Sequence, residues 1–290
     1  MTIKPAWLHK QSAIRYQTSS AGQVLRQWSL HTVCEEARCP NKGECFQNKV
    51  ATIMILGSTC SRACRFCSVT PGRDLPAPDH DEPERVAQAA LNLGLSHVVI
   101  TSVTRDDLPD GGASHFAQTI SAVRQKLPGA TVEVLTPDFQ GNTDAIETVI
   151  AAGPDVFNHN VETVPALYAK VRPQANYPRS LAFLAHIKNM APDMLTKSGI
   201  MVGLGETFEQ VVKVMEELAG IGLDMMTIGQ YLQPTRRNLE VAGYIEPGLF
   251  EEYARAGENL GIRKVFAGPY VRSSYQAGEA LLKTRLEPVE

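Results

Sequence analysis

Short apolar runs alternate with longer amphipathic stretches along most of the chain after residue 50. The first run, residues 51–57, is almost continuously apolar and ends at a glycine, which is the pattern of a buried strand. The other strands predicted on this pattern are 97–103, 131–135, 155–161, 199–203 and 225–230. Amphipathic stretches predict helices over 82–93, 113–126, 143–152, 178–191, 207–220 and 247–260.

Six strands that alternate with six helices predict an α/β fold with a parallel sheet. The apolar runs at 98–100 and 199–202 fit strands that are covered on both faces. Six such units can close partly into a barrel or lie open as a doubly wound sheet, and periodicity does not choose between the two. In both cases ligands bind at the carboxyl ends of the strands, so polar residues that follow the strands are candidates for a site.

The two ends of the chain differ from this middle part. Residues 1–50 show little periodicity apart from a short polar helical stretch near 22–29, and residues 276–290 predict a helical tail. We therefore expect an N-terminal extension (1–50), a central α/β part (51–260) and a C-terminal extension (261–290).

The composition is that of a globular chain, with 290 residues, 43% hydrophobic, 20% charged and a net charge of −3. This balance gives no general nucleic-acid surface. No apolar run approaches the roughly 20 residues of a membrane-spanning helix, and the N-terminus lacks the apolar region of a signal peptide. We expect a cytoplasmic protein with no nucleic-acid or membrane partner, in a compartment that keeps thiols reduced.

All six cysteines fall between residues 34 and 67, in one triplet spaced C-x4-C-x5-C and one spaced C-x3-C-x2-C. The triplets are Cys34, Cys39, Cys45 and Cys60, Cys64, Cys67. Disulfide frameworks belong mostly to small secreted domains, and zinc sites commonly use four ligands in C-x2-C pairs, so both alternatives are weaker than iron–sulfur clusters. Three thiolates can hold three corners of a cubic cluster and leave the fourth iron open to a small molecule.

The loop Cys60-Ser-Arg-Ala-Cys64-Arg-Phe-Cys67 directly follows the first predicted strand. It resembles the cluster loop of the radical S-adenosylmethionine (SAM) superfamily, including the aromatic residue before the last cysteine, here Phe66. The resemblance implies a partial (β/α)6 barrel of the TIM type and a 4Fe–4S cluster whose open iron binds SAM. That cluster gives one electron to SAM and releases a 5′-deoxyadenosyl radical, while the protein orients and shields the cofactor.

Further segments resemble SAM contacts of the superfamily. They lie in the fifth predicted strand, at the polar end of the fourth strand and shortly after it: Gly199, Met201, Gly203, Asn160, Glu162 and Arg172. Arginine suits a bidentate contact with the SAM carboxylate. The glycines alone could equally be ordinary strand-to-loop turns. The polar run 158–162 is harder to explain without partners, because buried polar groups are normally hydrogen-bonded.

The first triplet in residues 33–46 and the run Arg272-Ser-Ser-Tyr275 resemble the lipoyl synthase family, and the likeness continues through most of the chain. It implies that Cys34, Cys39 and Cys45 hold an auxiliary 4Fe–4S cluster with Ser274 as the fourth ligand. A serine oxygen is a harder and weaker partner for iron than a thiolate, so such a cluster is easier to take apart. This suits the role that the resemblance implies for it, namely that of the sulfur source. Taken alone, Arg-Ser-Ser-Tyr would more often be a capped turn.

The resemblance also implies the reaction and its partners. Two sulfur atoms are inserted at C6 and C8 of an octanoyl chain on a lysine, with one SAM for each. The implied partners are octanoylated lipoyl-carrier domains (2-oxoacid dehydrogenase E2 subunits or glycine cleavage H protein), a reductant such as ferredoxin or flavodoxin, and an iron–sulfur cluster delivery protein. We expect residues 1–50 to wrap the barrel, with the N-terminal and C-terminal extensions closing the open rim.

Two polar groups outside these motifs have two interpretations each. Asp106, Asp107 and Asp110 follow the second strand and could position SAM or the acyl-lysine amide, or form a solvated acidic loop. Arg236 and Arg237 could contact the substrate or carrier, or be surface charges.

The chain departs from the family where a histidine, a proline and an arginine are usual, at Asn238, Glu240 and Gly243. We expect these departures to touch neither cluster and to alter substrate-side contacts, as in a second-copy enzyme with a different partner preference. Ser58 and Ser68 are further small departures with little expected effect. The rival classes are an enzyme resembling biotin synthase, an iron–sulfur electron carrier, and a nonenzymatic iron–sulfur scaffold or regulator.

Overall fold

The structure is a computed structural model that describes residues 4–8, 20–47 and 50–286. It divides into two compact units. Unit 1 comprises Met1–Gln11, Ala63–Cys67 and Asn158–Glu290, and unit 2 comprises Ser12–Arg62 and Ser68–Phe157. The division passes through the cysteine loop, so Cys60 belongs to unit 2 whereas Cys64 and Cys67 belong to unit 1.

Unit 2 contains the parallel strands β2 (Thr52–Ile55), β5 (His97–Ser102) and β6 (Thr131–Leu135), in the order β2-β5-β6. A short strand, β1 (His31–Thr32), pairs antiparallel with β2. All four residues of β2 and the middle four of β5 are buried. These strands are therefore covered on both faces, as their apolar runs predict.

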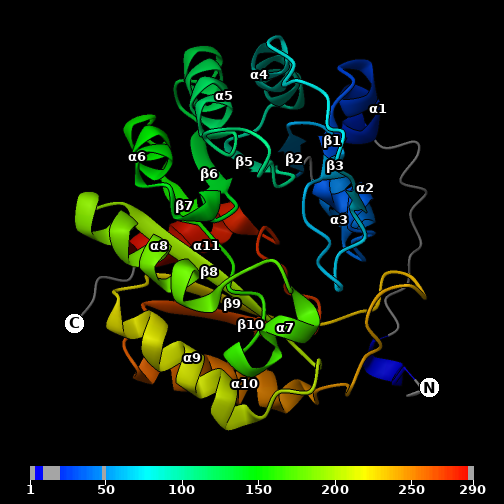
Figure 1. Cartoon of the computed structure of the whole chain (residues 1–290), viewed down its shortest axis with the longest axis vertical. Helices are drawn as coiled ribbons and strands as arrows, with labels where there is room; N and C mark the ends of the chain where they lie inside the picture. The colour runs from blue at the N-terminus through cyan, green and yellow to red at the C-terminus, as the bar shows by residue number, and fades with distance from the viewer. Residues whose placement is uncertain (1–3, 9–19, 48–49, 287–290) are drawn as a thin grey trace. The chain divides into compact units, whose positions relative to one another are not determined.

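The helices of unit 2 that follow these strands are α4 (Glu82–Leu93), α5 (Ala113–Lys126) and α6 (Thr143–Ala151), which stand in a row in Figure 1. Local sequence sets their ends. Gly94 ends α4 in the left-handed conformation at φ 64°, which a glycine adopts without a Cβ penalty. The side chain of Asn142 caps α6 by accepting a hydrogen bond from the backbone N–H of Ala145.

The part of unit 2 that precedes β2 carries short helices: α1 (Ser20–Gln27), α2 (Val33–Glu36) and α3 (Lys42–Gln47). Thr32 caps α2 by accepting from the N–H of Glu35. Two more short strands, β3 (Thr59–Cys60) and β4 (Thr70–Pro71), pair in parallel on either side of the cysteine loop in the sequence. A 3-10 turn, η3 (Phe139–Gly141), follows β6.

Unit 1 contains β8 (Leu195–Val202), β9 (Met225–Gln230) and β10 (Lys264–Gly268), all parallel, in the order β8-β9-β10. The short strand β7 (Val156–Asn158) ends at the boundary between the units. The helical elements are η1 (Ala6–Leu8), η4 (Pro165–Leu167), α7 (Tyr168–Val171), α8 (Tyr177–Met190), α9 (Phe208–Gly220), α10 (Pro247–Asn259) and α11 (Ala277–Leu286). Helices α9 and α10 lie next to each other, and α10 packs along β10 (Figure 1).

Every strand and helix predicted from the hydrophobic pattern is present, with ends that shift by a few residues. The structure adds β10, which the pattern did not indicate, and the short strand β1. Helix α11 confirms the helical tail up to Leu286, and residues 287–290 of that prediction lie outside the described residues, as do 1–3, 9–19 and 48–49 of the N-terminal extension. The three-part division of the chain and the wrapping of the barrel stay predictions.

Candidate active site

In unit 2 the sulfur of Cys60 receives backbone hydrogen bonds. Its Sγ accepts from the N–H of Arg62 at 3.4 Å and from the N–H of Thr104 at 3.3 Å. The carbonyl of Cys60 accepts from the N–H of Gly72. Hydrogen bonds to the cysteine sulfurs are one of the means by which proteins stabilise iron–sulfur clusters and set their potentials. The surroundings of Cys60 therefore fit a cluster ligand.

The side chain of Arg62, two residues after Cys60, is only 4% exposed, and its charged guanidinium is paired within unit 2. Its Nε and Nη2 donate to the two carboxylate oxygens of Asp106 at 2.6 and 2.9 Å, and Nη2 also donates to Asp138 at 2.5 Å. Burial opposes the charge of Arg62, but the hydrogen bonds and charges of Asp106 and Asp138 outweigh it and raise the pKa of the guanidinium. This bidentate pairing fixes the first half of the cysteine loop.

The acidic loop after β5 is engaged by unit 2 itself. Asp106 pairs with Arg62, and Asp107 accepts from Arg105 at 2.7 to 3.1 Å. Asp110 accepts from the backbone N–H of Gly112 at 2.9 Å and of Ser114 at 2.8 Å, at the start of α5. The hydrogen bond from Arg105 lowers the pKa of Asp107. Each carboxylate has a structural partner, which favours a structural role over a contact with SAM or the acyl-lysine amide.

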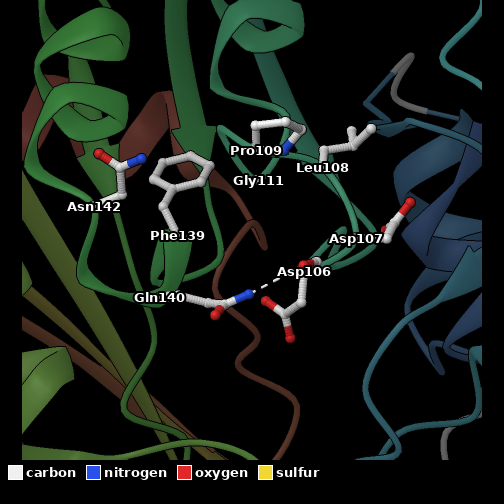
Figure 2. Close-up of a pocket in the computed structure, with 8 residues that line it drawn as sticks. All are labelled: Asp106, Asp107, Leu108, Pro109, Gly111, Phe139, Gln140 and Asn142. Carbon is white, nitrogen blue, oxygen red and sulfur yellow. Dashed lines mark hydrogen bonds between the residues drawn. The ribbon is translucent and has the colours of Figure 1, made fainter.

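A pocket of about 420 Å³ lies beside this loop, within unit 2 (Figure 2). It is lined by Asp106, Asp107, Leu108, Pro109, Gly111, Phe139, Gln140 and Asn142. Figure 2 shows the Gln140 side chain donating to the backbone carbonyl of Asp106, at 3.1 Å. Phe139 and Gln140 both have positive φ angles, 43° and 54°, which is strained backbone for residues with side chains. Sequence reasoning missed this turn, because neither residue type favours that conformation.

In unit 1 the second half of the cysteine loop is held by uncharged contacts. The N–H of Ala63 donates to Gln174 Oε1 at 2.6 Å, and the N–H of Arg65 donates to the carbonyl of Val171 at 2.9 Å. The ring of Phe66 packs against an apolar cluster built on Val171, Leu204 and Tyr231. The predicted aromatic residue therefore anchors Ala63–Cys67 in the core of unit 1.

Asn160 and Glu162 follow β7 and lie beside β8 in unit 1. The Asn160 side chain is 8% exposed, and its Nδ2 donates to Glu162 Oε1 at 3.1 Å and to Ser273 Oγ at 2.6 Å. Its Oδ1 is buried and has no partner among the residues that the structure describes. A Cβ at Gly199 would lie 2.8 Å from this oxygen. The position thus offers an acceptor next to a site where only glycine fits, which suits a bound ligand with N–H or O–H groups.

Burial raises the pKa of the Glu162 carboxyl, while the charge of Arg172 and the hydrogen bond from Asn160 oppose the shift. The Nη1 of Arg172 donates to the carbonyls of Asn160 and Val161, at 2.9 and 3.2 Å, so it holds the strand end in place. Its Nε is buried without a partner among the described residues. The pairing of Arg172 with a SAM carboxylate stays a prediction.

Gly203, at the end of β8, has a φ of 97°, and a Cβ there would collide with the Gln230 side chain and the carbonyl of Gly243. The position therefore requires glycine for both conformation and space. Met201 is partly buried and packs against the same apolar cluster as Phe66. The predicted SAM residues are thus brought together in unit 1 by β8 and the chain after β7.

The first triplet lies in unit 2. Burial raises the pKa of the Cys34 thiol to about 11, and the nearby Cys39 adds to this, while hydrogen bonds with Thr52 oppose it. The N–H of Cys39 donates to the carbonyl of Cys34, and Cys45 lies on α3. Among the described residues no three His, Cys, Asp or Glu side chains stand close enough to hold one metal ion. A cubic cluster binds each cysteine at a different iron, so its ligands need not converge on one metal ion. Its irons would also supply the positive charge that the buried Cys34 thiolate needs.

Ser274 follows β10 in unit 1, in a turn where the N–H of Tyr275 donates to the carbonyl of Arg272. Its neighbour Ser273 accepts the hydrogen bond from Asn160 described above. Because Ser274 and the first triplet belong to different units, its assignment as a cluster ligand stays a prediction.

The expectation that the departures from the family touch neither cluster stays a prediction, but Asn238 does contact the backbone of a predicted ligand residue. Its Nδ2 donates to the carbonyl of Cys67 at 2.7 Å, within unit 1. The backbone N–H of Gly243 donates to Gly203 in the predicted SAM motif. The side chain of Ser68, from which little effect was expected, donates to the carbonyl of Glu36 on α2, the helix of Cys34. Arg236 and Arg237 are exposed, as surface charges would be.

The family model described as "Radical SAM superfamily" matches residues 54–218, more than half of the chain. Similar solved structures include methylornithine synthase, with a TM-score of 0.53 and 15% identity over 83% of this chain and 73% of that one. Another is coproporphyrinogen III oxidase from Escherichia coli, with a TM-score of 0.52 and 15% identity over 72% of this chain and 52% of that one. Likeness at this identity shows the fold alone, and it confirms the predicted fold class. The class of protein is therefore a radical SAM enzyme.

Curated relatives narrow the class. The chain is 56% identical to the lipoyl synthase of Caldanaerobacter subterraneus subsp. tengcongensis, over 98% of this chain and 100% of the relative. It is 52% identical to the lipoyl synthase of Thermus thermophilus, over 97% of this chain and 87% of the relative. The chain belongs to the lipoyl synthase family. Its cofactors are accordingly 4Fe–4S clusters and SAM, as predicted.

None of the helices in the described part of the chain is both long and apolar enough to span a bilayer.

Proposed function

We propose that the protein converts an octanoyl chain on a carrier-domain lysine into a lipoyl group, by inserting sulfur at C6 and C8. Family membership at more than half identity over nearly the whole chain supports the reaction. The observation that carries the cofactor side is the buried, partnerless Oδ1 of Asn160 beside Gly199, an acceptor ready for a polar ligand.

In this proposal the residues of the second triplet, Cys60, Cys64 and Cys67, hold the cluster that binds SAM. When bound, that cluster and SAM supply the electron and the radical needed to remove hydrogen from an unactivated C–H bond. The residues of unit 1 orient SAM. Asn160 offers its free acceptor, and the missing side chain of Gly199 lets this oxygen lie close to the strand, since a Cβ there would be 2.8 Å from it. The chain thereby positions the reacting groups and excludes water.

The first triplet with Ser274 holds the auxiliary cluster, which is the sulfur substrate of the reaction. A buried Cys34 keeps its thiolate only while iron compensates the charge, because burial raises its pKa to about 11. The oxygen of Ser274 binds iron more weakly than a thiolate, so this ligand leaves most easily as the cluster gives up sulfur.

The substrates are lipoyl-carrier proteins. We propose 2-oxoacid dehydrogenase E2 subunits or the glycine cleavage H protein as carriers, ferredoxin or flavodoxin as reductant, and an iron–sulfur delivery protein that rebuilds the consumed cluster. Reduced cluster thiols require a reducing compartment, which for this enzyme is the cytoplasm.

The test is an anaerobic reaction of the reconstituted protein with SAM, a reductant and an octanoyl-lysine peptide. We expect 5′-deoxyadenosine together with a peptide that has gained two sulfur atoms, and a matching loss of iron and sulfide from the protein. Ser274→Ala and Cys34→Ala should lower sulfur insertion by on the order of 100-fold while SAM cleavage persists.

Ser273→Ala is the matched control, since it removes the neighbouring hydroxyl and leaves the proposed ligand. Because this hydroxyl also accepts from Asn160 Nδ2, sulfur insertion is expressed per SAM cleaved, and that ratio should stay close to the parent's. If Ser274→Ala and Cys34→Ala both insert sulfur at the parent rate, the role of the first triplet as the sulfur source is wrong.

A further inference from the structure

The side chain of Asn238 reaches the backbone of the cysteine loop, 171 residues away in the sequence and within unit 1. Its Nδ2 donates to the carbonyl of Cys67 at 2.7 Å and to the carbonyl of Arg65 at 3.3 Å. The backbone N–H of Leu239 donates to the same Arg65 carbonyl at 3.0 Å. Two consecutive residues therefore hold the loop segment that ends at the last cysteine.

The chemistry of these partners calls for a primary amide. Both carbonyls only accept, so the NH2 end of Asn238 must face them. Its Oδ1 is then left to accept from the hydroxyl of Thr235, at 2.6 Å. A histidine carries at most one N–H on each ring nitrogen, so one ring nitrogen cannot supply a separate N–H to each of two carbonyls. An aspartate would set carboxylate oxygens against the two carbonyls.

Further contacts hold the rest of Ala63–Cys67. The N–H of Arg65 donates to Val171, and the ring of Phe66 packs in the apolar cluster. The N–H of Cys67 donates to the carbonyl of Cys64 at 3.1 Å, and its carbonyl accepts from Asn238, so this side chain contributes to the orientation of the last residue of the loop. The orientation of the Cys67 backbone in turn sets the direction in which its thiol points.

We propose that Asn238 is a positioning residue of the radical SAM site, which orients Cys67, in the part of the second triplet that belongs to unit 1, before the cluster arrives. The inference rests on the proposed role of the second triplet as ligand of the SAM-binding cluster. It assigns to a departure from the family a function at the cluster loop, in place of the substrate side.

The test follows the SAM-binding cluster alone, without any acyl substrate. The full-length chain with Cys34→Ala, Cys39→Ala and Cys45→Ala is reconstituted anaerobically, and iron release to a chelator and the EPR spectrum of the reduced cluster with and without SAM are measured. Asn238→Ala should release iron about tenfold faster, because two hydrogen bonds are lost. Asn238→Asp should release it faster still, and Asn238→His should recover part of the loss.

Glu240→Gln is the matched control, since it lies two residues away and is exposed. The EPR change on adding SAM should weaken in the alanine variant, recover in the histidine variant and stay unchanged in the control. A residue with a purely structural role would lower the stability of the apo protein without this pattern. If the triple variant holds no iron, the same substitutions are compared in the intact protein by the SAM-dependent EPR change.

The inference is overturned if Asn238→Ala and Asn238→Asp both release iron and respond to SAM as the parent does. Its failure is distinct from failure of the proposed function. A parent protein that binds SAM at its cluster but never makes a lipoyl group contradicts the function and leaves the positioning role supported. Normal sulfur insertion with all Asn238 variants indistinguishable from the control contradicts the positioning role alone.

Discussion

The two halves of the cysteine loop are held by different chemistry. Around Cys60, in unit 2, a buried arginine is compensated by two carboxylates and the cysteine sulfur accepts two backbone N–H groups. Around Cys67, in unit 1, the contacts are uncharged: backbone hydrogen bonds, the amide of Asn238 and the ring of Phe66 in an apolar cluster. The first half depends on charge balance and the second on direction and packing, so they should fail under different substitutions and different pH.

The largest expected effect is in the charged half. Arg62→Met leaves the carboxylates of Asp106 and Asp138 without their cation, and the Asp138 side chain is fully buried. Breaking a buried ion pair from one side costs about 3 kcal/mol or more, because the remaining charge stays desolvated. Urea unfolding of the apo protein should show a free energy of unfolding lower by about that amount.

Arg65→Met is the control for this prediction, since Arg65 lies three residues further along the same loop and is exposed. It should change the free energy of unfolding by less than about 0.5 kcal/mol. Equal effects of the two substitutions would mean that the ion pairs of Arg62 do not support unit 2.

A smaller effect is expected in the apolar half. Phe66→Ala removes a ring that is packed against Val171, Leu204 and Tyr231 but is only partly buried. The free energy of unfolding should fall by about 2 kcal/mol, less than for a fully buried phenylalanine. Phe66→Leu keeps most of the packing and should cost under about 1.5 kcal/mol. If alanine and leucine cost the same in urea unfolding, the ring does not anchor the loop.

Most of the fold was predictable because helix and strand periodicities are local. Helix α9 is an example, since its capping box of Thr207 and Gln210 and its apolar face are both written within 14 residues of sequence. Strand β10 was not predictable on this basis. Its apolar run is only three residues long, 265–267, and lies outside the alternation of strands and helices that the pattern predicts. Only Val265 of the five residues is buried, and the strand pairs with β9.

The site divides in the same way between local and distant information. The spacing of the cysteines and the aromatic residue before Cys67 are local, and they indicated the cluster loop. The partners of Arg62 lie 44 and 76 residues away, and a single sequence carries no signal for such a pair. For the same reason Asp106 was interpreted as a ligand or a solvated charge, and Asn238 was placed on the substrate side.

The smallest effect concerns one carboxylate from each unit, Glu162 and Asp107, for which we expect opposite pH dependences of stability. Burial raises the pKa of Glu162 in unit 1 above its ordinary value of 4.5, whereas the hydrogen bond from Arg105 lowers that of Asp107 in unit 2 below 3.8. As pH rises above 4.5, the Glu162 carboxyl ionises in the unfolded chain before it ionises in the folded one. The stability that this residue contributes is therefore lost as pH rises through its folded pKa. Asp107 has the opposite sign and lowers the stability as pH falls through its own.

Glu162→Gln should therefore gain stability relative to the parent as pH rises from 4.5, and the gain should level off above the folded pKa. Asp107→Asn should lose stability relative to the parent at neutral pH, with the loss shrinking in acid. Urea unfolding of the apo proteins between about pH 2 and 8 measures both, since the Asp107 effect is lost only below pH 3.8, with the exposed Glu240→Gln as the control. Parallel pH profiles for the Glu162 and Asp107 variants would remove the contrast between a carboxylate that is paired, Asp107, and one that is buried with only partial compensation, Glu162.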